Sequence, residues 1–497
     1  MSSQVPTDHS TRSVVDNWIK AHQGVLFIDN TFVPARSGAM FDVVNPATGQ
    51  VIGGSAEGSA EDVDAAVRSS VEAFENGPWS RMSAQERAHH LRRFADAVAR
   101  ARDELVELGT LENGMTLDMS RIQIDNAVEN LLYFAGTAVT VAGRTLPSAP
   151  SNLFQTLREP IGVCAAITAW NGPVVGTTWK IGPALASGNT MILKPAEQTP
   201  FSALRMAELA VEAGMPPGVL NVVTGHGPGA GSALVEHPGV GKITFTGSTA
   251  VGKKILTGSV ATLKRVTLEL GGKSPNIVWS DADLDLAVPA SVGAFTSLTG
   301  QMCSAWSRVF VHEDIHEEFT QRLAAAVGEV RWGDPTDPGT TIGPLISADQ
   351  YDRVGLYLAA GKEEGATAIV GGELVEGDGY FVQPTVFTGV TNNMRIAKEE
   401  IFGPVLSVIS FRDEDEVVAQ ANDTEYGLGA AIWTRDLSRA HRLSRRVRAG
   451  SIWINHVGNI NDVMMPFGGY RQSGLGRELG LDWYHAYTEE KAVLIRL

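Results

Sequence analysis

The sequence is poor in cysteine, with only Cys164 and Cys303 among 497 residues. Two cysteines cannot build the disulfide framework that stabilises many small secreted proteins. The N-terminal segment, MSSQVPTDHS, also lacks the basic and apolar regions of a secretory signal. We therefore expect a cytoplasmic protein.

The sequence also lacks long apolar runs and an excess of positive charge. No uncharged apolar run reaches the roughly 18 residues that a membrane-spanning helix needs. The formal net charge is -16, whereas nucleic acids and anionic membrane surfaces attract basic proteins. Neither is expected as a partner, and a chain of this length should divide into two or three domains.

Clustered metal ligands are missing as well. The eleven histidines are scattered, and no third ligand stands near His89 and His90 or near His312 and His316. The second pair has the i,i+4 spacing of helical metal ligands, but it lies among carboxylates at an expected helix start. A solvated helix face explains it better, so no metal site is expected.

The sequence does contain a regular alternation of helical and strand-like segments. Residues 61–74, 84–108 and 117–138 carry apolar residues at spacings of three and four, which predicts three helices. From Pro160 onward, short β-branched runs alternate with helical stretches, and a second such series begins near Pro275. Because parallel strands need crossover connections, usually helices, these series predict an α/β protein with a doubly wound, mostly parallel sheet and a second α/β domain.

Two further strand-like segments, Asn152 to Arg158 and Lys491 to Leu497, fit neither series. Both segments would belong to a sheet if they formed a projecting edge ribbon that pairs with another subunit. The alternative is a plain hairpin or a tail strand on the same domain. We favour subunit pairing, and with it a homodimer or homotetramer.

Cys303 and Glu269 are the leading candidates for catalysis. Cys303 stands in TGQMCSAWSR, and a thiol is a nucleophile that needs a base and an electrophile. Glu269 stands in LELGGKSP, at the expected end of a strand, and is the candidate base. A free thiol is only a few per cent ionised at neutral pH, so either the site favours the thiolate or a base takes the proton. Cys164, in an apolar strand, is expected in the core.

The segment Thr244 to Lys254 has the pattern of a strand, a glycine turn, hydroxyl residues and a helix start. Unpaired N–H groups and the helix dipole at such a start bind phosphate, with Gly247 and Gly252 at the turn and the close-packing position. The alternative is an ordinary turn in which a hydroxyl residue caps the helix. The glycines between Gly225 and Gly231 match the dinucleotide-binding pattern only loosely.

Two more pairs of residues follow expected strands. Glu197 comes shortly after Lys194, where a carboxylate either complements a helix dipole or accepts from the ribose 2′-hydroxyl of NAD. Asn171 follows the strand IGVCAAIT, at the sheet edge where ligands bind in such folds, and its amide can donate to an oxyanion. Taken alone, Asn171 is more simply a turn residue and Trp170 a core aromatic.

All these motifs occur together and in one order, and in that order the chain resembles the aldehyde dehydrogenase superfamily. The resemblance covers nearly the whole length, and its motifs are NPATG at Asn45, WN at Trp170, KPAEQTP at Lys194, FTGSTAVG at Phe245, LELGGKSP at Leu268, GQMCSAWSR at Gly300, EEIFGPV at Glu399 and PFGGYRQSGLGRE at Pro466. It implies a modified Rossmann domain for NAD over residues 1–141 and 160–271. It also implies a catalytic domain over 272–469 and an oligomerisation ribbon over 142–159 and 487–497.

The activity that the resemblance implies is NAD-dependent oxidation of an aldehyde to the carboxylic acid. Cys303 would attack the aldehyde carbon, while Asn171 and the Cys303 backbone N–H stabilise the oxyanion, a donor of this type being worth about 10²–10³ in rate. Hydride transfer would leave a thioester, for whose hydrolysis Glu269 would activate water. Glu478 resembles a family acid that helps to relay protons, although a structural salt bridge fits it equally well. Lys180 and Lys273 are interpreted as supporting charges.

The resemblance also assigns the cofactor contacts. The positions are Lys194 and Glu197 for the adenosine ribose, Gly227 for the adenine side, Gly247 and Ser248 for the pyrophosphate turn, Glu400 and Phe402 for the nicotinamide ribose and ring, and Ile167, Trp170 and Leu270 around them. NAD is the expected cofactor. NADP stays open because Glu197 can turn aside.

One departure from the family pattern concerns the substrate. Gly172 follows the catalytic asparagine where relatives often carry an aromatic residue, and Gly176 one turn later is also small. We expect a wide entrance for bulky, aromatic or branched apolar aldehydes, lined by Trp179, Met302 and the loop from His456 to Met465. The alternatives are a CoA-acylating or semialdehyde-specific relative and, from a different class, a non-catalytic binding descendant.

Overall fold

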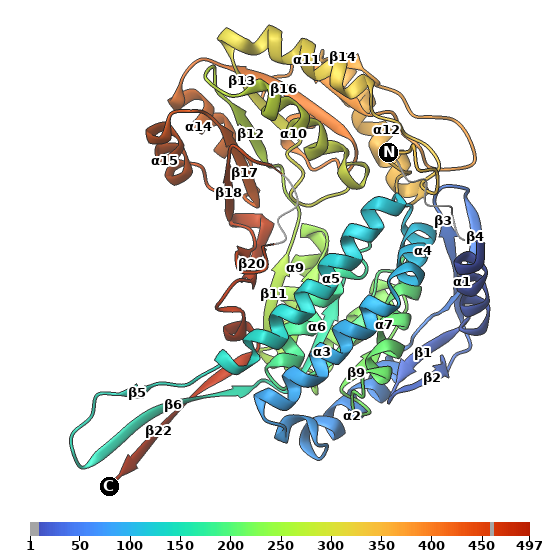
Figure 1. The fold of residues 1–497 in the computed structure, drawn as a ribbon, viewed down its shortest axis with the longest axis vertical. Helices are drawn as coiled ribbons and strands as arrows, with labels where there is room; N and C mark the ends of the chain where they lie inside the picture. The colour runs from blue at the N-terminus through green and yellow to red at the C-terminus, as the bar shows by residue number, and fades with distance from the viewer. Residues whose placement is uncertain (1–8, 458–461) are drawn as a thin grey trace.

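The computed structural model describes residues 9–457 and 462–497, which form two stacked α/β layers and a projecting β-ribbon (Figure 1). The lower layer in that view holds an eight-stranded sheet and the upper layer a seven-stranded sheet. No helix in the described ranges is long and apolar enough to cross a membrane. The predicted α/β class with mostly parallel sheets is confirmed.

The eight-stranded sheet has the order β2-β1-β9-β8-β7-β10-β11-β20 among the described residues. Its five central strands are parallel, whereas β1, β2 and β20 join antiparallel at the edges. The strands are β1 (Val25–Ile28), β2 (Thr31–Pro34), β7 (Val163–Ile167), β8 (Thr190–Lys194), β9 (Leu220–Val222), β10 (Lys242–Thr246), β11 (Arg265–Glu269) and β20 (Gly474–Leu475).

Helices cover both faces of this sheet, because its central strands are apolar on both sides. In β7, Cys164 and Ala166 join one core cluster, while Val163, Ala165 and Ile167 join the other. The first face is covered by α3 (Ala84–Arg100), α4 (Arg102–Asn113), α5 (Leu117–Thr137), α6 (Val175–Ala186) and α7 (Pro200–Glu212); the second is covered by α2 (Ala60–Glu75), α8 (Ser232–Glu236) and α9 (Thr249–Gly258). Helix α1 (His9–Ala21) and the hairpin β3 (Met40–Asn45) and β4 (Gln50–Ala56) flank this layer.

The helices begin and end largely where local chemistry indicates. Ser59 and Ser83 each form a capping box at the start of α2 and α3, and Gly114 ends α4 in the left-handed conformation. The predicted single helix over 84–108 is wrong, since the chain leaves helical geometry at Ala101 and starts α4 at the next residue. Both halves pack against α5 and α7, but α3 also packs against α6 and α4 against α1, and this packing overrides local propensity.

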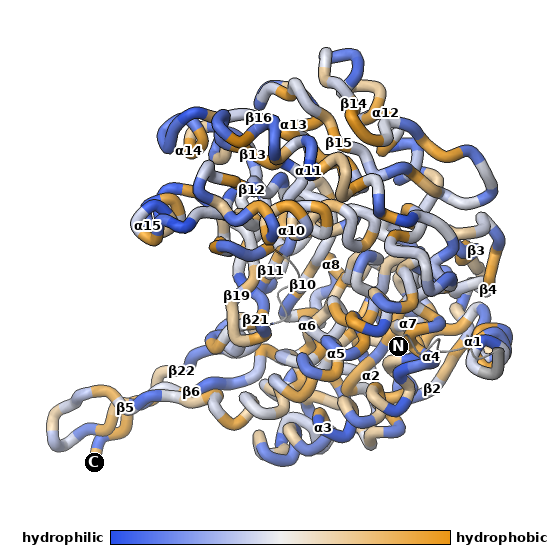
Figure 2. Tube along the Cα trace, turned by 45° about the horizontal axis from the view of Figure 1, so that its top comes forward, coloured by the Kyte–Doolittle hydropathy of each residue, from blue (hydrophilic) through white to orange (hydrophobic). Residues whose placement is uncertain are grey.

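The seven-stranded sheet has the order β14-β15-β16-β13-β12-β17-β18 in the described part of the chain, and only β14 is antiparallel. Its strands are β12 (Pro275–Val278), β13 (Arg308–His312), β14 (Thr367–Val370), β15 (Thr385–Thr388), β16 (Val405–Phe411), β17 (Gly429–Trp433) and β18 (Ser451–Ile454). Its helices are α10 (Leu284–Thr296), α11 (His316–Gly328), α12 (Ala348–Glu363), α13 (Arg395–Lys398), α14 (Glu414–Asn422) and α15 (Leu437–Arg446). The outward helices α14 and α15 are largely hydrophilic in colour (Figure 2).

The two strand-like segments that fitted neither series pair with each other. Strand β22 (Thr488–Arg496) runs antiparallel to β6 (Asn152–Pro160) along its full length, and β5 (Thr145–Leu146) joins the other edge of β6. The resulting three-stranded ribbon extends away from both layers and carries the C-terminus at its far end (Figure 1).

Candidate active site

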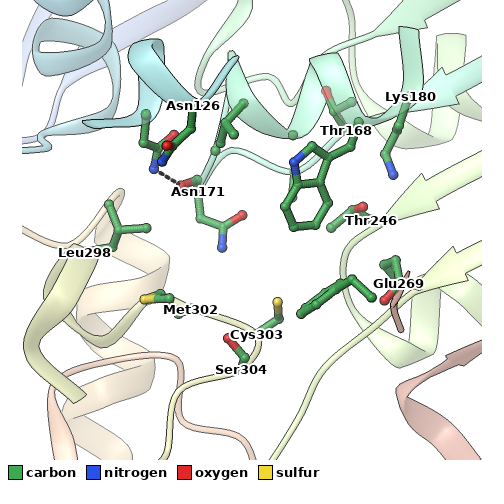
Figure 3. A pocket seen from close by; sticks show the side chains of 17 residues that line it. Asn126, Thr168, Asn171, Lys180, Thr246, Glu269, Leu298, Met302, Cys303 and Ser304 are labelled. Atoms are coloured by element: carbon green, nitrogen blue, oxygen red, sulfur yellow. Dashed lines mark hydrogen bonds between the residues drawn. The ribbon is translucent and has the colours of Figure 1, made fainter. Parts of the chain in front are cut away.

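A pocket opens between the two layers, at the carboxyl ends of β7, β10 and β11. It encloses about 940 Å³, including the part open to solvent. The residues that line it are Gln123, Asn126, Thr168, Ala169, Asn171, Gly172, Val175, Gly176, Trp179, Lys180, Thr246, Glu269, Leu298, Met302, Cys303, Ser304 and Phe467. Figure 3 shows the side chains of Asn171 and Cys303 pointing toward each other across this space, with Glu269 beside Thr246 at one side.

A strained turn places Cys303 at the pocket. After α10 the backbone turns through Leu298 and Thr299, both with positive φ, and then through Gly300 at φ 71°. A Cβ at Gly300 would lie 2.3 Å from the backbone of Gly403, so only glycine allows this approach. The turn leaves Cys303 half-buried, with its thiol facing the pocket.

The surroundings of Cys303 disfavour a free thiolate. Burial, together with the nearby carboxylates Glu269 and Glu400, raises the pKa of the thiol to about 12. Of the two possibilities that the sequence leaves open, a base that takes the proton therefore fits this environment better than a preformed thiolate.

Glu269 ends β11 as a buried carboxyl group. Neither of its oxygens has a hydrogen-bond partner among the described residues. Burial raises the pKa of Glu269 well above its usual range, and the neighbouring Glu478 raises it further. The raised pKa means that this carboxyl group holds a proton more readily than an exposed glutamate does, and its oxygens have free lone pairs for a water molecule.

Asn171 lies in the loop between β7 and α6, held at both ends. Its Nδ2 donates to the backbone oxygen of Gln301 at 2.9 Å. Asn113 Nδ2 donates to the oxygen of Trp170 at 2.7 Å, and Gln123 Nε2 donates to the oxygen of Asn171 at 3.2 Å. These bonds orient the side-chain amide toward Cys303 and leave one Nδ2 hydrogen for a ligand.

Glu478 and Lys180 form a fully buried ion pair behind Glu269. Lys180 Nζ lies 2.5 Å from Glu478 Oε1, and Thr244 Oγ1 donates to the same oxygen at 3.0 Å. The expected salt bridge of Glu478 is thus present, and Lys180 also lines the pocket. Its charge lowers the pKa of Glu269, opposing the effect of burial.

A second group of candidates surrounds the start of α9. Ser248 caps this helix, since its side chain accepts from Val251 N, so the capping alternative holds locally. A Cβ at Gly247 would lie 2.4 Å from the Phe245 ring, and one at Gly252 would lie 2.6 Å from Leu270. Both glycines therefore allow close approach where the helix meets the sheet.

Lys194, Glu197 and Gly227 lie at the neighbouring end of β8. Lys194 is buried, and its Nζ donates to Pro195 O at 2.8 Å and lies 3.8 Å from the partly exposed carboxylate of Glu197. The loosely matched glycines form the short helical turn Gly227–Gly231, and a Cβ at Gly227 would meet no atom within 4 Å. Ile167 is paired with Lys194 in the sheet, so both residues lie at the carboxyl ends of adjacent parallel strands, β7 and β8.

Glu400 and Phe402 approach from the second layer. Glu400 Oε1 accepts from Gly272 N at 3.0 Å, and burial raises the pKa of Glu400 to about 7. Phe402 has a φ of 62°, and its ring meets Trp170 edge to face at 5.2 Å. Lys273, one residue beyond Gly272, is buried without a hydrogen-bond partner among the described residues, and burial lowers its pKa to about 7.

The pocket differs from the expected entrance in one respect. Gly172, Gly176, Trp179 and Met302 line it as predicted. The described residues of the loop from His456 to Met465 do not, while 458–461 lie outside the described residues. Phe467 takes that place, edge to face with Trp179 at 5.3 Å. Phe467 belongs to the short strand β19 (Pro466–Phe467), which pairs with β21 (Glu478–Leu479).

Several lining residues escape sequence reasoning, namely Gln123, Asn126, Val175, Leu298 and Phe467. Gln123 and Asn126 belong to α5, far from every motif, and only the packing of α5 against α6 brings them to the pocket. The recurrence of amide residues at spacings of three and four, Gln123, Asn126 and Asn130, was the available signal. Cys164, by contrast, is fully buried in the core as predicted.

The comparison with known families decides the assignment of the chain. The profile of the aldehyde dehydrogenase family matches residues 32–493. The chain belongs to the aldehyde dehydrogenase family. The mitochondrial aldehyde dehydrogenase of Homo sapiens is 46% identical over 475 residues, covering 95% of this chain and 92% of that protein. An aldehyde dehydrogenase of Emericella nidulans is 45% identical over 474 residues, covering 95% of each.

Solved aldehyde dehydrogenase structures share the whole fold. The NAD⁺ complex of the Bacillus cereus enzyme superimposes with a TM-score of 0.95 at 44% identity, covering 97% of this chain and 98% of that one. The likeness therefore extends over both layers and the ribbon, and the family resemblance drawn from the motifs is confirmed.

Proposed function

We propose that this protein oxidises an aldehyde to its carboxylic acid with NAD, through a covalent intermediate on Cys303. The observation that carries the proposal is the convergence of a thiol, an amide donor and an unpaired carboxyl group on one pocket, from Cys303, Asn171 and Glu269. Acyl transfer through a thiol needs these three roles: nucleophile, oxyanion donor and base.

The first step is attack of the Cys303 sulfur on the aldehyde carbon. The sulfur–carbon bond forms as the C=O π bond breaks, and the thiol proton passes to a base. The oxyanion lies between the free Nδ2 hydrogen of Asn171 and the Cys303 backbone N–H. Hydrogen bonds with Gln301, Asn113 and Gln123 hold the loop that carries Asn171. The amide of Asn171 therefore needs little reorientation when negative charge develops on the aldehyde oxygen.

The residues around α9 and Glu400 fit a dinucleotide. The N-terminus of α9 supplies backbone N–H groups and a helix dipole that suit a phosphate. Glu197 offers a partly exposed carboxylate to ribose hydroxyls. A Cβ at Gly271 would overlap Glu400, which accepts from Gly272 N at 3.0 Å. We assign the cofactor to Ile167, Trp170, Lys194, Glu197, Gly227, Gly247, Ser248, Leu270, Glu400 and Phe402. NAD, when bound, accepts the hydride that leaves the former aldehyde carbon.

The last step is hydrolysis of the thioester on Cys303. Glu269 takes a proton from a water molecule, the hydroxide oxygen bonds to the acyl carbon, and the carbon–sulfur bond breaks to release the acid. The Lys180–Glu478 pair lies directly behind Glu269 and offers a buried route for its proton. A CoA-acylating enzyme has no need of such a water-activating group.

The substrate is proposed to be a bulky apolar or aromatic aldehyde. Gly172 and Gly176 present no side chain to the pocket, and a Cβ at Gly176 would meet no atom within 4 Å. Trp179, Phe467, Leu298 and Val175 supply apolar walls around the space so left. The expected preference is therefore for aldehydes larger than acetaldehyde.

The experiment that tests this function is NADH formation by the purified protein with short aliphatic, long aliphatic and aromatic aldehydes, with Cys303→Ala as control. Turnover that disappears in Cys303→Ala supports the thiol mechanism, and a higher kcat/KM for phenylacetaldehyde than for acetaldehyde supports the substrate class. Cofactor binding without turnover on every aldehyde would refute the enzyme and favour a non-catalytic binding protein. A clear preference for acetaldehyde would refute the proposed substrate class and leave the proposed reaction intact.

NADP is the second cofactor to test. Glu197 would repel a 2′-phosphate, but its side chain is partly exposed and its only ion-pair contact among the described residues is the 3.8 Å one to Lys194. We expect kcat/KM to be higher with NAD than with NADP. Glu197→Gln removes the charge that repels the 2′-phosphate, so the ratio of kcat/KM with NAD to kcat/KM with NADP should be smaller in this variant. Equal efficiency of the wild-type protein with both cofactors would refute the choice of NAD.

The assembly and compartment complete the proposal. We assign residues 1–141 and 160–271 to the cofactor domain, 272–469 to the catalytic domain, and 142–159 and 487–497 to a ribbon that joins subunits into a homodimer or homotetramer. The cytoplasm remains the predicted location, although the human relative is a mitochondrial enzyme.

A further inference from the structure

One side of the substrate pocket is polar, and the reaction proposed above does not use it. Gln123 and Asn126 stand three residues apart on α5, so their side chains share one helix face, and both line the pocket. Asn126 lies on the same side of the pocket as Asn171 in Figure 3. The pocket also has an apolar wall, from Trp179, Phe467 and Met302.

The orientation of the Gln123 amide follows from its partner. Its Nε2 donates to the backbone oxygen of Asn171 at 3.2 Å, and the reverse orientation would place two oxygens against each other. Gln123 Oε1 is therefore an acceptor, and it is buried without a hydrogen-bond partner among the described residues. A buried acceptor without a donor is costly, so a ligand that brings a donor is favoured there.

Gly172 lines the pocket beside this acceptor. A Cβ at residue 172 would lie 3.6 Å from Gln123 Oε1 and 3.1 Å from Val175. Any larger side chain at 172 would therefore lean over the amide of Gln123. Glycine keeps the space above it open, and the half-buried amide of Asn126, which has no hydrogen bond to the described part of the chain, borders the same space.

From this juxtaposition we infer that Gln123 and Asn126 select aldehydes that carry a hydrogen-bond donor, such as a hydroxyl group, on the part of the molecule remote from the reacting carbon. This inference rests on the proposed function and narrows its substrate class. The apolar wall holds the body of the substrate, and the α5 amides hold its donor. Both amides act in recognition and neither touches the reacting carbon.

The test compares each aldehyde with its own hydroxylated form. Phenylacetaldehyde is paired with its three ring-hydroxylated isomers and hexanal with 6-hydroxyhexanal, and the matching methoxy compounds serve as analogues of similar polarity without a donor. In the wild-type protein we expect kcat/KM to rise roughly tenfold for at least one hydroxylated form, the scale of one hydrogen bond. The methoxy compounds should show no such rise.

The variant for this test is Asn126→Leu, which has nearly the same size but no amide. We expect the ratio of kcat/KM between the hydroxylated aldehyde and its parent to fall to about one. Glu129→Leu is the matched control, because Glu129 is exposed one turn further along α5 and does not line the pocket. Its ratio should equal that of the wild-type protein. Gln123 is unsuitable as the primary variant because its Nε2 also supports Asn171.

Three results would overturn the inference. If no hydroxylated form exceeds its parent, or if the methoxy form gains equally, the α5 amides do not recognise a donor. If the preference is unchanged in Asn126→Leu, Asn126 takes no part, and the pair of α5 amides is not the recognition site. In all three cases turnover of the parent aldehydes keeps the proposed function intact, whereas absence of turnover on parents and hydroxylated forms alike refutes the function and the inference together.

Discussion

At the scale of single residues, the site works through groups that burial makes reluctant to ionise. The thiol of Cys303 has a pKa of about 12, and Glu269 has its pKa raised well above the usual range. Because both groups favour their neutral forms, the thiol proton has to leave as the sulfur–carbon bond forms and not before. Two predictions follow from this pairing.

The first prediction concerns hydrolysis of the thioester. Glu269→Gln keeps the size of the side chain but cannot accept a proton from water, so acyl transfer to water should slow by about 10²–10⁴. The first turnover needs no water, provided that another base takes the thiol proton. Stopped-flow measurement of NADH should then show a burst of about one equivalent per active site followed by a slow steady state. A steady-state rate equal to that of wild type would remove Glu269 from this role.

The second prediction concerns pH. Only the thiolate reacts with iodoacetamide, so alkylation of Cys303 without cofactor should be slow near pH 7 and accelerate up to tenfold per pH unit below its raised pKa of about 12. The charge of Glu400 raises the pKa of this thiol, so Glu400→Gln should lower it and speed alkylation several-fold at pH 8. Mass spectrometry of the modified peptide measures the rate, with Cys303→Ala as blank. Slower alkylation in Glu400→Gln would contradict this electrostatic account.

At the scale of elements, the pocket depends on how α5 and α6 pack. These helices supply Gln123, Asn126, Gly176 and Trp179 to the pocket, and they contact each other along their length. Gly182 of α6 lies at the closest point, because a Cβ there would lie 2.3 Å from the ring of Phe134 in α5. A small residue is thus required for the two helices to meet.

We therefore predict that Gly182→Ala destabilises the protein although alanine favours helix formation. Overpacking against a buried aromatic ring costs about 1–3 kcal/mol, which exceeds the roughly 1 kcal/mol of helix propensity that alanine contributes. Thermal unfolding should show a lower Tm. Gly136→Ala in α5, where a Cβ would meet nothing within 4 Å, is the control and should keep or raise Tm. Equal Tm values for Gly182→Ala and wild type would contradict this prediction and show that α5 and α6 can move apart to accommodate a methyl group.

At the scale of the whole molecule, the ribbon is the feature that a single chain does not explain. Strands β5, β6 and β22 project from both layers, and leucines at the far end are exposed, Leu494 by 70% and Leu497 by 75% (Figure 2). Exposed apolar side chains on an extended sheet are typical of a surface that another subunit covers.

We predict that the protein in solution has two or four times the 53.0 kDa mass of one chain, as a homodimer or homotetramer requires. Replacing Leu494 and Leu497 by arginine should lower this mass, because charged residues would have to be buried at the contact. Light scattering coupled to size-exclusion chromatography measures it. Leu437→Arg, on an equally exposed leucine of α15, is the control and should leave the mass unchanged. A wild-type mass of one chain would refute the assembly.

Local patterns predicted much of the fold. Apolar runs bounded by glycines located β7, β8, β10 and β11, and their alternation with helices predicted parallel sheets, because only helical crossovers connect such strands compactly. The break at Ala101 was not predictable, since alanine, arginine and acidic residues all favour continued helix there. The separate packing of α3 and α4 decides it.

The candidate site divides in the same way. Residues in contiguous motifs, such as Cys303, Glu269 and Asn171, were predictable because each motif places its residue at a strand end or a turn, where local backbone chemistry leaves a recognisable pattern. Gln123, Asn126 and Phe467 were not, because side chains on one helix and on one short strand reach the pocket only through packing that spans hundreds of residues. Sequence alone therefore determined the family and the α/β class, and it predicted the reacting groups that we propose. Tertiary structure decided the walls of the pocket, since a wall is made of whichever surfaces the folded layers bring together.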